Sequence, residues 1–346
     1  MKALITATFH PDGLARLRRH MDVEYDDWRA SKRIYYDGQQ FAERIRAVGA
    51  DVLIVEADLV HEEVLDTCRL KLIGCCRGDP INIGIDRATA LGIPVVFAPA
   101  RNADAVADLT LGFMLALARH IYTVNTLIKQ GQMRFESTKD YLSAYETYGG
   151  FELGGVTVGI VGFGAIGRGV AQRLHGFGAT VVAYDPYVKA DVFAAYHATP
   201  VSLDELVQRC DILTVHCPDL PETTGLIGPE QIGNLKRGAY VLNLARAAII
   251  NDDALYTALS DGHLAGAALD VFRDEPLQPD NRFVKLPNVL VSPHLGGATR
   301  DVVRHQTDLV VDGIEAILRG ERPKHIVNPE VLEKTPDNRQ RTTDPS

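Results

Sequence analysis

The sequence predicts an α/β protein with two doubly wound parallel sheets. Its 346 residues exceed the usual size of one hydrophobic core, so two domains are expected. Short apolar and β-branched runs alternate with helical stretches in both halves of the chain. In the second half, one such run leads into Gly162, Gly164 and Gly167, a spacing typical of a tight strand-to-helix turn.

The first hundred residues contain four strand-like runs and two helical stretches. In chain order they are Leu4 to Thr8, Pro11 to Met21, Phe41 to Ala47, Val52 to Glu56, Leu70 to Gly74 and Val95 to Ala98. We expect residues 1–102 to form one domain. Residues 298–332 are expected to return to it, because an amphipathic helix at Arg300 to Leu318 and a turn at Gly320 to Lys324 follow the second half.

A long apolar segment joins the two halves. Ala105 to Val124 is apolar on nearly every face, so a helix there has to be buried between domains or between subunits. The following segment, Met133 to Gly150, carries Tyr141, Tyr145 and Tyr148 and is longer than a simple connection. It either lines a cleft or packs against a second subunit.

Residues 103–297 are expected to form the second domain around a six-stranded parallel sheet. The predicted strands are Val156 to Val161, Thr180 to Tyr184, Ile212 to His216, Ala239 to Asn243, Leu264 to Asp270 and Val289 to Ser292. The end of the chain, residues 333–346, has no apolar period and is predicted to be a disordered tail.

The glycine turn and a downstream acid together predict a dinucleotide site. Glycines at this spacing let backbone N–H groups approach a pyrophosphate, which the N-terminus of the following helix also attracts. Asp185 lies 18 residues beyond Gly167, at the end of the next predicted strand. Its carboxylate can accept hydrogen bonds from both ribose hydroxyls of NAD and repels the 2′-phosphate of NADP. We therefore expect NAD, although Lys189 offers a phosphate a partner and such glycines can serve packing alone.

Composition and charge argue against several other classes. The net charge of −9 disfavours a nucleic-acid-binding surface, and no apolar run approaches the roughly 20 residues of a membrane span. The N-terminus resembles a strand rather than a signal sequence, so a cytoplasmic protein is expected. The cysteines lack metal-binding spacing, which predicts reduced thiols and no metal site: Cys68, Cys75, Cys76, Cys210 and Cys217.

Three segments at predicted strand ends hold Arg246, Glu275 and His294. In open α/β sheets, ligands bind beyond these ends. A histidine can take and return the hydroxyl proton of a 2-hydroxy acid during hydride transfer to a nicotinamide. A carboxylate on its other ring nitrogen fixes the tautomer and favours imidazolium, and a guanidinium holds a substrate carboxylate in a fork. Taken singly, His294 could instead satisfy a loop carbonyl, and Glu275 could be a solvated acid.

Five ordered motifs give the chain a resemblance to the D-isomer-specific 2-hydroxyacid dehydrogenases, the family of D-lactate, glyoxylate/hydroxypyruvate, formate and D-3-phosphoglycerate dehydrogenases. The resemblance covers roughly residues 45–325. The motifs lie at residues 162–168 (GFGAIGR), 216–227 (HCPDLPETTGLI), 242–246 (LNLAR), 269–277 (LDVFRDEPL) and 292–299 (SPHLGGAT).

The resemblance implies a Rossmann NAD domain, a flavodoxin-like substrate domain assembled from both chain ends, and a homodimer supported by the long apolar helix. It implies that Arg246, Glu275 and His294 are the catalytic triad. It places Arg168 near the pyrophosphate, Cys217 and Pro218 beside the adenosine, and Ala245 and Asp270 near the nicotinamide. The remaining cofactor-binding candidates are Gly162, Phe163, Gly164, Ala165, Ile166, Gly167, Asp185, His216, Thr223, Leu244, Gly296 and Gly297.

The chain departs from the family pattern at several positions. Ala247 follows the catalytic arginine where glycine is usual, and Asn251 stands where the family often has aspartate. The substrate loop of the family, which presents N–H groups to a carboxylate, is replaced by the stretch from Gly74 to Gly84. The substrate candidates in this stretch are Cys76, Arg77 and Gly78, and Arg101 is a further candidate in the next loop. If both arginines face the substrate, it carries a second anion or several hydroxyls; otherwise they are ordinary surface arginines.

The main interpretation is an NAD-dependent oxidoreductase that interconverts a 2-oxo acid and its D-2-hydroxy acid. The nearest alternative is a D-3-phosphoglycerate dehydrogenase that lacks the regulatory domain some members carry. An alternative of another class is an NAD-sensing binding protein, because the family also contains transcriptional corepressors with this fold and triad. Such a protein is expected to show a peptide-binding cleft or disordered interaction segments, for which only the stretch after Glu333 qualifies.

Overall fold

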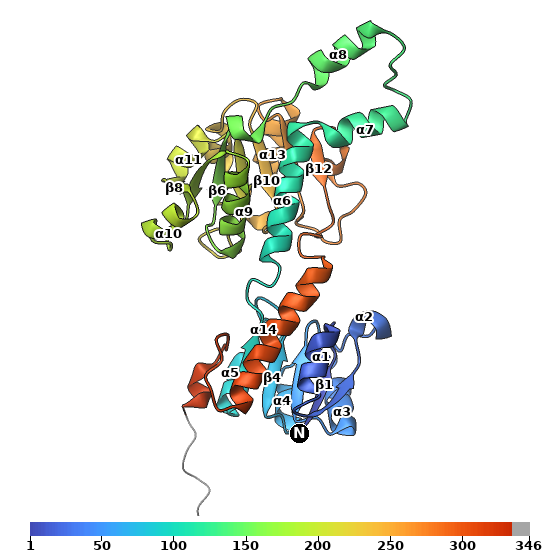
Figure 1. Cartoon of the computed structure of the whole chain (residues 1–346), viewed down its shortest axis with the longest axis vertical. Coiled ribbons are helices and arrows are strands. Elements are labelled where there is room, and N and C mark those ends of the chain that lie inside the picture. The colour runs from blue at the N-terminus through green and yellow to red at the C-terminus, as the bar shows by residue number, and fades with distance from the viewer. Residues whose placement is uncertain (334–346) are drawn as a thin grey trace, which may run out of the picture. The chain divides into compact units, whose positions relative to one another are not determined.

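The computed structural model describes residues 1–333, so the predicted tail lies outside the described part except for Glu333. The chain divides into two compact units (Figure 1). One contains Met1–Arg101 together with residues 299–333, and the other contains Asn102–Ala298.

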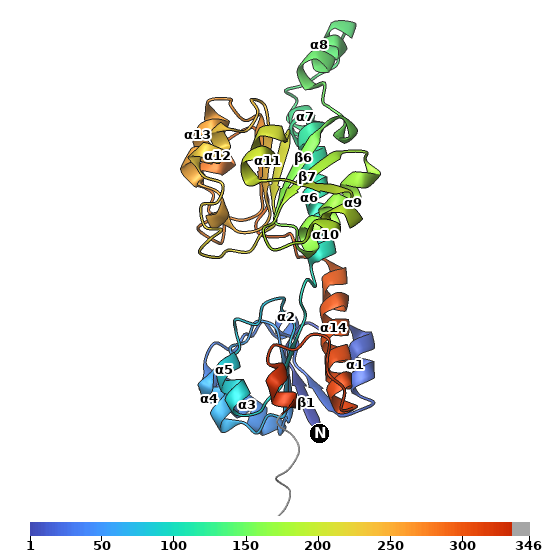
Figure 2. The same ribbon diagram turned by 90° about the vertical axis from the view of Figure 1, so that its left-hand side faces the viewer.

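The first unit is a five-stranded parallel sheet in the order β2-β1-β3-β4-β5, which is the flavodoxin-like strand order. Its strands are β1 (Lys2–Ile5), β2 (Asp22–Tyr25), β3 (Val52–Val55), β4 (Leu72–Cys75) and β5 (Val95–Phe97). Its helices are α1 (Pro11–Leu17), α2 (Trp28–Ser31), α3 (Gly38–Val48), α4 (Glu62–Thr67), α5 (Ile85–Ala90) and α14 (Arg300–Leu318), with a 3₁₀ turn at Pro329–Leu332. In Figure 2, α1 and α14 cover one face of this sheet and α3, α4 and α5 the other.

The predicted helix at Arg300 to Leu318 is confirmed as α14. It packs closely on β4, where a Cβ built at Gly74 would come within 2.7 Å of the Val310 side chain. Strand β2 was missed by the sequence analysis, because it is a partly exposed edge strand with two acidic residues and has no continuous apolar run.

The second unit is a seven-stranded parallel sheet in the order β12-β11-β10-β9-β6-β7-β8. The six predicted strands appear as β6 (Thr157–Val161), β7 (Thr180–Tyr184), β9 (Ile212–Val215), β10 (Tyr240–Asn243), β11 (Gly266–Leu269) and β12 (Val289–Val291). The prediction of six strands was one short. The seventh, β8 (Ala198–Pro200), is a three-residue edge strand that ends in proline, so it lacks the usual strand pattern.

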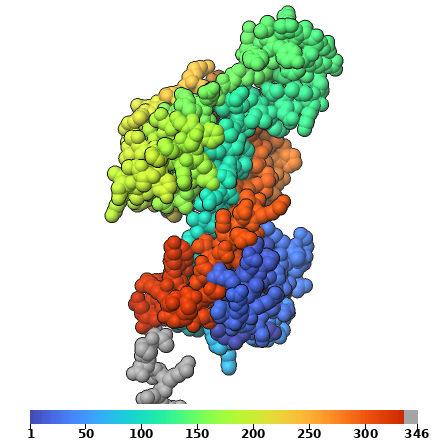
Figure 3. Space-filling view, viewed as in Figure 1, coloured from blue at the N-terminus to red at the C-terminus, as the bar shows by residue number. Residues whose placement is uncertain are grey.

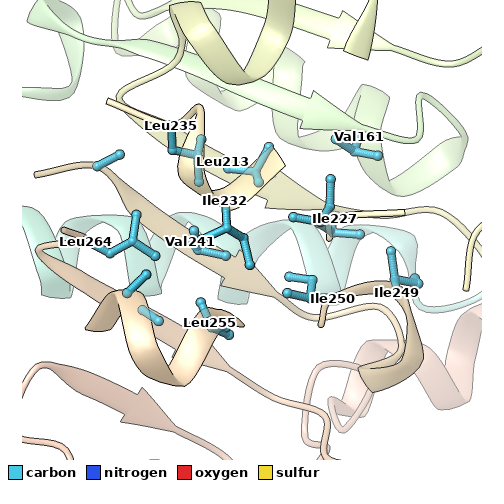
Figure 4. Packing of buried hydrophobic residues seen from close by; sticks show 14 of the residues in the cluster. Val161, Leu213, Ile227, Ile232, Leu235, Val241, Ile249, Ile250, Leu255 and Leu264 are labelled. Atoms are coloured by element: carbon cyan, nitrogen blue, oxygen red, sulfur yellow. The ribbon is translucent and has the colours of Figure 1, made fainter. Parts of the chain in front are cut away.

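Helices cover both faces of this sheet, as the doubly wound prediction requires. They are α6 (Ala103–Ala118), α9 (Ala165–Gly176), α10 (Ala190–Ala195), α11 (Leu203–Arg209), α12 (Pro229–Gly233) and α13 (Asp252–Ser260), with 3₁₀ turns at Leu153–Gly155, Ala247–Ile249 and Arg282–Lys285. Two buried apolar clusters lie on opposite faces of the sheet. Figure 4 shows the cluster beneath α12 and α13, with Leu213 and Val241 from the sheet against Ile232 and Leu255 from the helices.

The prediction of a single long helix between Ala105 and Val124 is wrong. The chain forms α6 and then α7 (Ile121–Lys129), bent by 63°. The break falls at His120, which has a left-handed φ of 51°. The Ala118 carbonyl there accepts the N–H of Phe151 at 3.1 Å. Because no glycine or proline marks this break, the apolar pattern alone did not reveal it.

The expected burial applies to α6 and does not extend to α7. Helix α6 packs against α9 and contributes to the buried core of the second unit. Helix α7 and the tyrosine-rich α8 (Thr138–Tyr148) contain no buried residue, and they project from the rest of this unit in Figure 3. No single described helix is long and apolar enough to cross a membrane; α6 and α7 meet that test only as a bent pair.

Candidate active site

The glycine turn between β6 and α9 leaves the N-terminus of α9 open. A Cβ at Gly162 would lie 2.5 Å from the Cys217 nitrogen, and one at Gly167 would lie 2.2 Å from the Gly162 oxygen, so neither position accepts a larger residue. Gly164, in contrast, has nothing within 4 Å of its Cβ position, and no side chain caps the helix here. The first and third glycines thus serve the tight turn and packing, and the second allows a phosphate to approach the free N–H groups.

Asp185 lies at the end of β7, beside this turn. Its Oδ2 accepts the N–H of Phe163 at 2.8 Å, and its Oδ1 accepts the N–H of Tyr187 at 3.0 Å. These bonds fix the carboxylate at the edge of the glycine turn while each oxygen keeps a further lone pair. The predicted ribose contact is therefore held in place by backbone groups. Phe163 contributes through its N–H, because its ring is buried and stacked on Phe193.

The ends of β6, β7 and β9 surround a pocket of about 300 Å³. Since β6 and β9 are where the strand order reverses, this is the position at which doubly wound sheets bind nucleotides. The predicted candidates Gly162, Asp185, Cys217, Pro218 and Thr223 line it. Thr223 is fixed by donating to the Pro218 carbonyl at 2.6 Å. Arg168 donates to the Gly164 carbonyl at 3.1 Å, which holds its guanidinium at the same turn.

His216 and Cys217 differ in their access to this pocket. Burial raises the pKa of the Cys217 thiol to about 11, so it is a neutral wall of the pocket. His216 is buried, and burial lowers its pKa to about 3. Its Nε2 lies 2.9 Å from the Thr214 hydroxyl, and its Nδ1 has no partner among the described residues. A neutral imidazole beneath the turn fits a structural support better than a charged contact.

A second pocket of about 440 Å³ brings Arg246, Glu275 and His294 together. The three come from the segments that follow β10, β11 and β12. His294 Nδ1 lies 2.7 Å from Glu275 Oε2, which leaves the Nε2 nitrogen for a substrate. Both side chains are partly exposed, at 48% for the histidine and 36% for the glutamate. The structure thus joins residues that lie 19 to 48 positions apart in the sequence.

Glu275 is held in its charged form. Burial alone would raise its pKa, but the hydrogen bonds from His294 and from the Phe272 N–H, with the charges of His294 and Arg246, lower the pKa below its usual value. The Phe272 N–H donates to Oε1 at 3.1 Å. One carboxylate oxygen is thus fixed by the backbone and the other by the imidazole, so Glu275 orients the His294 ring.

Asp270 builds the loop that carries His294. Its side chain is 1% exposed and accepts the N–H groups of Leu295 and Gly296, each at 2.8 Å, and the Ser292 hydroxyl. Its own carbonyl accepts the His294 N–H at 2.8 Å. These bonds hold His294 at a left-handed φ of 55°, a conformation rare for a residue with a Cβ. Asp270 is thus a scaffold for the histidine.

Arg246 is positioned by a residue that the sequence analysis did not single out. Asn243, 3% exposed, donates to the Arg246 carbonyl at 2.9 Å and accepts the Ala245 N–H at 3.1 Å. The Arg246 side chain is exposed and donates to the Ala245 carbonyl at 2.7 Å. It has no ion pair within the described residues, so its charge is free to bind an anion.

The other nucleotide-domain candidates are placed as follows. Gly296 packs directly on the Asp270 carboxylate, since a Cβ there would lie 2.9 Å from Oδ2, and a Cβ at Gly297 would lie 3.0 Å from Asn102 Nδ2. Leu244 is buried in the core on the α6 face. Ala165 is exposed and Ile166 is partly exposed in the first turn of α9.

The substrate candidates of the first unit differ in what they can offer. Cys76 is fully buried and its N–H donates to the Val55 carbonyl at 2.8 Å, so this N–H is not available to a substrate. Arg101 is paired with Glu56 at 2.9 Å and also contacts Gln306. Arg77 is partly exposed beside the exposed Gly78 and has no ion pair among the described residues. Of the two predicted arginines, only Arg77 carries an unbalanced charge.

Comparisons with known proteins identify relatives of this chain. The family model for the NAD-binding domain of D-isomer specific 2-hydroxyacid dehydrogenases matches residues 111–296. The chain is 34% identical over 340 residues to a glyoxylate reductase of Thermofilum pendens, covering 97% of this chain and 96% of that protein. It is 35% identical over 331 residues to a D-3-phosphoglycerate dehydrogenase of Methanocaldococcus jannaschii, covering 95% of this chain but only 59% of that protein.

The fold is also matched by a solved structure, the TT0316 protein of Thermus thermophilus, at a TM-score of 0.78 and 33% identity, covering 94% of this chain and 100% of that one. These matches define the class of protein as an NAD-dependent oxidoreductase of hydroxy acids. The chain belongs to the D-isomer specific 2-hydroxyacid dehydrogenase family. The predictions of family, fold class and NAD are confirmed.

Proposed function

We propose that this protein reduces a 2-oxo acid to its D-2-hydroxy acid, and catalyses the reverse reaction, with His294 as the general acid and base. The observation that carries the proposal is the 2.7 Å hydrogen bond between His294 Nδ1 and Glu275, in one pocket with the guanidinium of Arg246, which has no ion pair in the described part of the chain. When bound, NAD supplies or accepts the hydride at its nicotinamide ring.

The chain's own residues handle the proton and the substrate. The free Nε2 of His294 donates a proton to the carbonyl oxygen during reduction and removes it from the hydroxyl during oxidation. Glu275 fixes the tautomer and stabilises the protonated ring. Arg246 binds the substrate carboxylate and polarises the carbonyl, because its planar fork matches a carboxylate.

We further propose that Arg77 takes a second anionic or hydroxylated group of the substrate. No carboxylate among residues 1–333 pairs with Arg77, whereas Arg101 is paired with Glu56. The relative that acts on phosphoglycerate supports a phosphorylated substrate as the alternative, but the chain spans only 59% of that protein. The glyoxylate reductase relative is matched over nearly its whole length and supports a small substrate.

The decisive experiment measures NADH oxidation by the purified protein with glyoxylate, pyruvate, hydroxypyruvate, phosphohydroxypyruvate and longer sugar-derived 2-oxo acids. Arg77→Ala should raise KM for phosphorylated or hydroxylated substrates by about tenfold and leave glyoxylate nearly unchanged. Arg87→Ala, which removes a surface arginine paired with Asp66, is the matched control. Equal effects of Arg77→Ala on all substrates contradict the second contact. No turnover of any acid, with NADH still bound, favours the sensor alternative.

We also propose that α7 and α8 form a homodimer contact. Neither helix contains a buried residue. Their large apolar side chains are exposed: Ile121 at 55%, Tyr122 at 61%, Ile128 at 47%, Tyr141 at 54%, Leu142 at 60% and Tyr145 at 80%. Apolar patches of this kind are typical of protein interfaces. Light scattering should give a dimer mass, and Leu142→Asp should shift it toward the monomer. A monomeric wild-type protein rejects the contact.

We propose a cytoplasmic location, which the free cysteines support. All five are thiols without a disulfide, and four of them are buried. Such thiols are typical of reducing compartments.

A further inference from the structure

A hydrogen bond crosses the rim of the nucleotide pocket. The hydroxyl of Tyr187 donates to Glu222 Oε1 at 3.3 Å, and both residues line the pocket together with Asp185. Tyr187 is also tied to the other side, because its N–H donates to Asp185 Oδ1 at 3.0 Å. Asp185, Tyr187 and Glu222 thus form one hydrogen-bonded chain, the Tyr187 bridge, that connects the segment after β7 with the segment after β9.

The charged side chains that line this pocket are acidic. Among the twelve described residues that line it there are two carboxylates, Asp185 and Glu222, and no lysine or arginine. Lys189, the cation that a 2′-phosphate would need, is not among them. Glu222, by its charge and as a hydrogen-bond acceptor, raises the pKa of the Tyr187 hydroxyl, and Asp185 adds a smaller effect. The tyrosine therefore stays neutral and keeps its proton for Glu222.

We infer that Glu222, held by Tyr187, is a second determinant of the preference for NAD over NADP, acting beside Asp185. The inference rests on the assignment of NAD as cofactor and not on the substrate. A 2′-phosphate brings about two negative charges into a pocket that already holds two carboxylates. Asp185 alone accounts for the ribose contact, whereas Glu222 adds repulsion that acts only on the phosphate. NADH, without this phosphate, is little affected by Glu222.

Fluorescence titration of the full-length protein with NADH and with NADPH, without substrate, tests the inference. Glu222→Gln should lower the ratio of the NADPH to the NADH dissociation constant by about tenfold, with NADH binding changed by less than about twofold, because the interaction of an exposed charge with a phosphate a few ångströms away in water is close to the free energy of a tenfold change. Tyr187→Phe should lower this ratio by about threefold, since Glu222 keeps its charge but loses the hydrogen bond from the Tyr187 hydroxyl. Glu230→Gln removes an exposed charge outside the pocket and should leave the ratio unchanged.

Salt separates repulsion from a structural role. Raising the ionic strength from ~0.05 to ~0.5 M should lower the ratio of the NADPH to the NADH dissociation constant more in the wild type than in Glu222→Gln, because screening weakens the interaction between exposed charges. If Glu222→Gln weakens the binding of NADH and NADPH equally, or leaves the ratio of their dissociation constants unchanged, the inference is overturned. Failure of the wild type to bind NADH overturns the cofactor assignment with it. An enzyme inactive on every acid but with the predicted binding ratios contradicts the proposed function alone.

Discussion

Asp270 is the residue whose removal should reveal most about the active site, because it holds the His294 loop without lining the catalytic pocket. Asp270→Asn keeps the size of the side chain but replaces one carboxylate oxygen by an amide nitrogen. At least one of the three accepted hydrogen bonds is then lost, and a donor that was bonded to a charged acceptor is left facing another donor. Hydrogen bonds to charged groups contribute about 1.5–3 kcal/mol, and an unsatisfied buried donor costs about 1–3 kcal/mol.

We therefore expect Asp270→Asn to lower the free energy of opening this loop by about 2–4 kcal/mol. The left-handed conformation of His294, which itself costs about 1–2 kcal/mol, would no longer be offset. Turnover should fall sharply while NADH still binds. Hydrogen exchange of the segment 292–298, followed by mass spectrometry, should show protection reduced by a factor of about 30 to 1000, since 1.4 kcal/mol corresponds to tenfold.

Ser292→Ala provides the matched comparison. It removes one neutral donor from Asp270 and leaves the two backbone donors at Leu295 and Gly296 in place. The expected loss is about 1 kcal/mol, or roughly fivefold in protection. Equal effects of the two variants, or unchanged protection and turnover in Asp270→Asn, would refute the claim that this carboxylate supports the histidine.

Three further predictions concern the catalytic residues. His294→Ala should abolish turnover and leave the NADH dissociation constant within about twofold, as read by fluorescence titration; retained turnover excludes it as acid and base. Arg246→Lys should raise KM for the 2-oxo acid by tenfold or more with NADH affinity unchanged, because an ammonium cannot form the bidentate contact. The pKa of Glu275 is held below its ordinary value of 4.5, so its contribution to stability is complete above that pH and lost as the pH falls through the lower, folded value. Glu275→Gln should therefore lower the unfolding midpoint near pH 7 and make progressively less difference below about pH 4.5; a constant difference down to pH 3 contradicts the assignment.

The sequence revealed those parts of the site whose chemistry is local. The glycine turn, Asp185 and the strands around them follow from spacing and from apolar runs, and the structure has them where they were predicted. The edge strands β2 and β8 were missed because edges are short and mixed in composition. The break at His120 depends on a contact between Ala118 and Phe151, which are 33 positions apart, so no local pattern could reveal it.

The sequence could not predict which side chains of the site pair with one another. Arg77 and Arg101 looked alike in the sequence, yet only the fold shows that Glu56, 45 positions away, neutralises Arg101. Asn243 and Tyr187 were not predicted as site residues because the sequence does not show which groups they contact. Their partners, the Arg246 carbonyl and the Glu222 carboxylate, identify what they do. Residue type alone therefore located the chemistry, and the hydrogen-bond partners decided which groups remain available for a ligand.

The site divides two tasks between two carboxylates. Asp270 is buried and binds backbone N–H groups, so it determines where the His294 backbone lies. Glu275 is partly exposed and binds the imidazole itself at Nδ1, so it orients the ring. A buried charge is tolerated at Asp270 because three donors surround it, while exposure at Glu275 lets the ring reach substrate and solvent. Loss of Asp270 should therefore displace the His294 backbone, and loss of Glu275 should leave that backbone in place but free the ring to reorient, which weakens proton transfer.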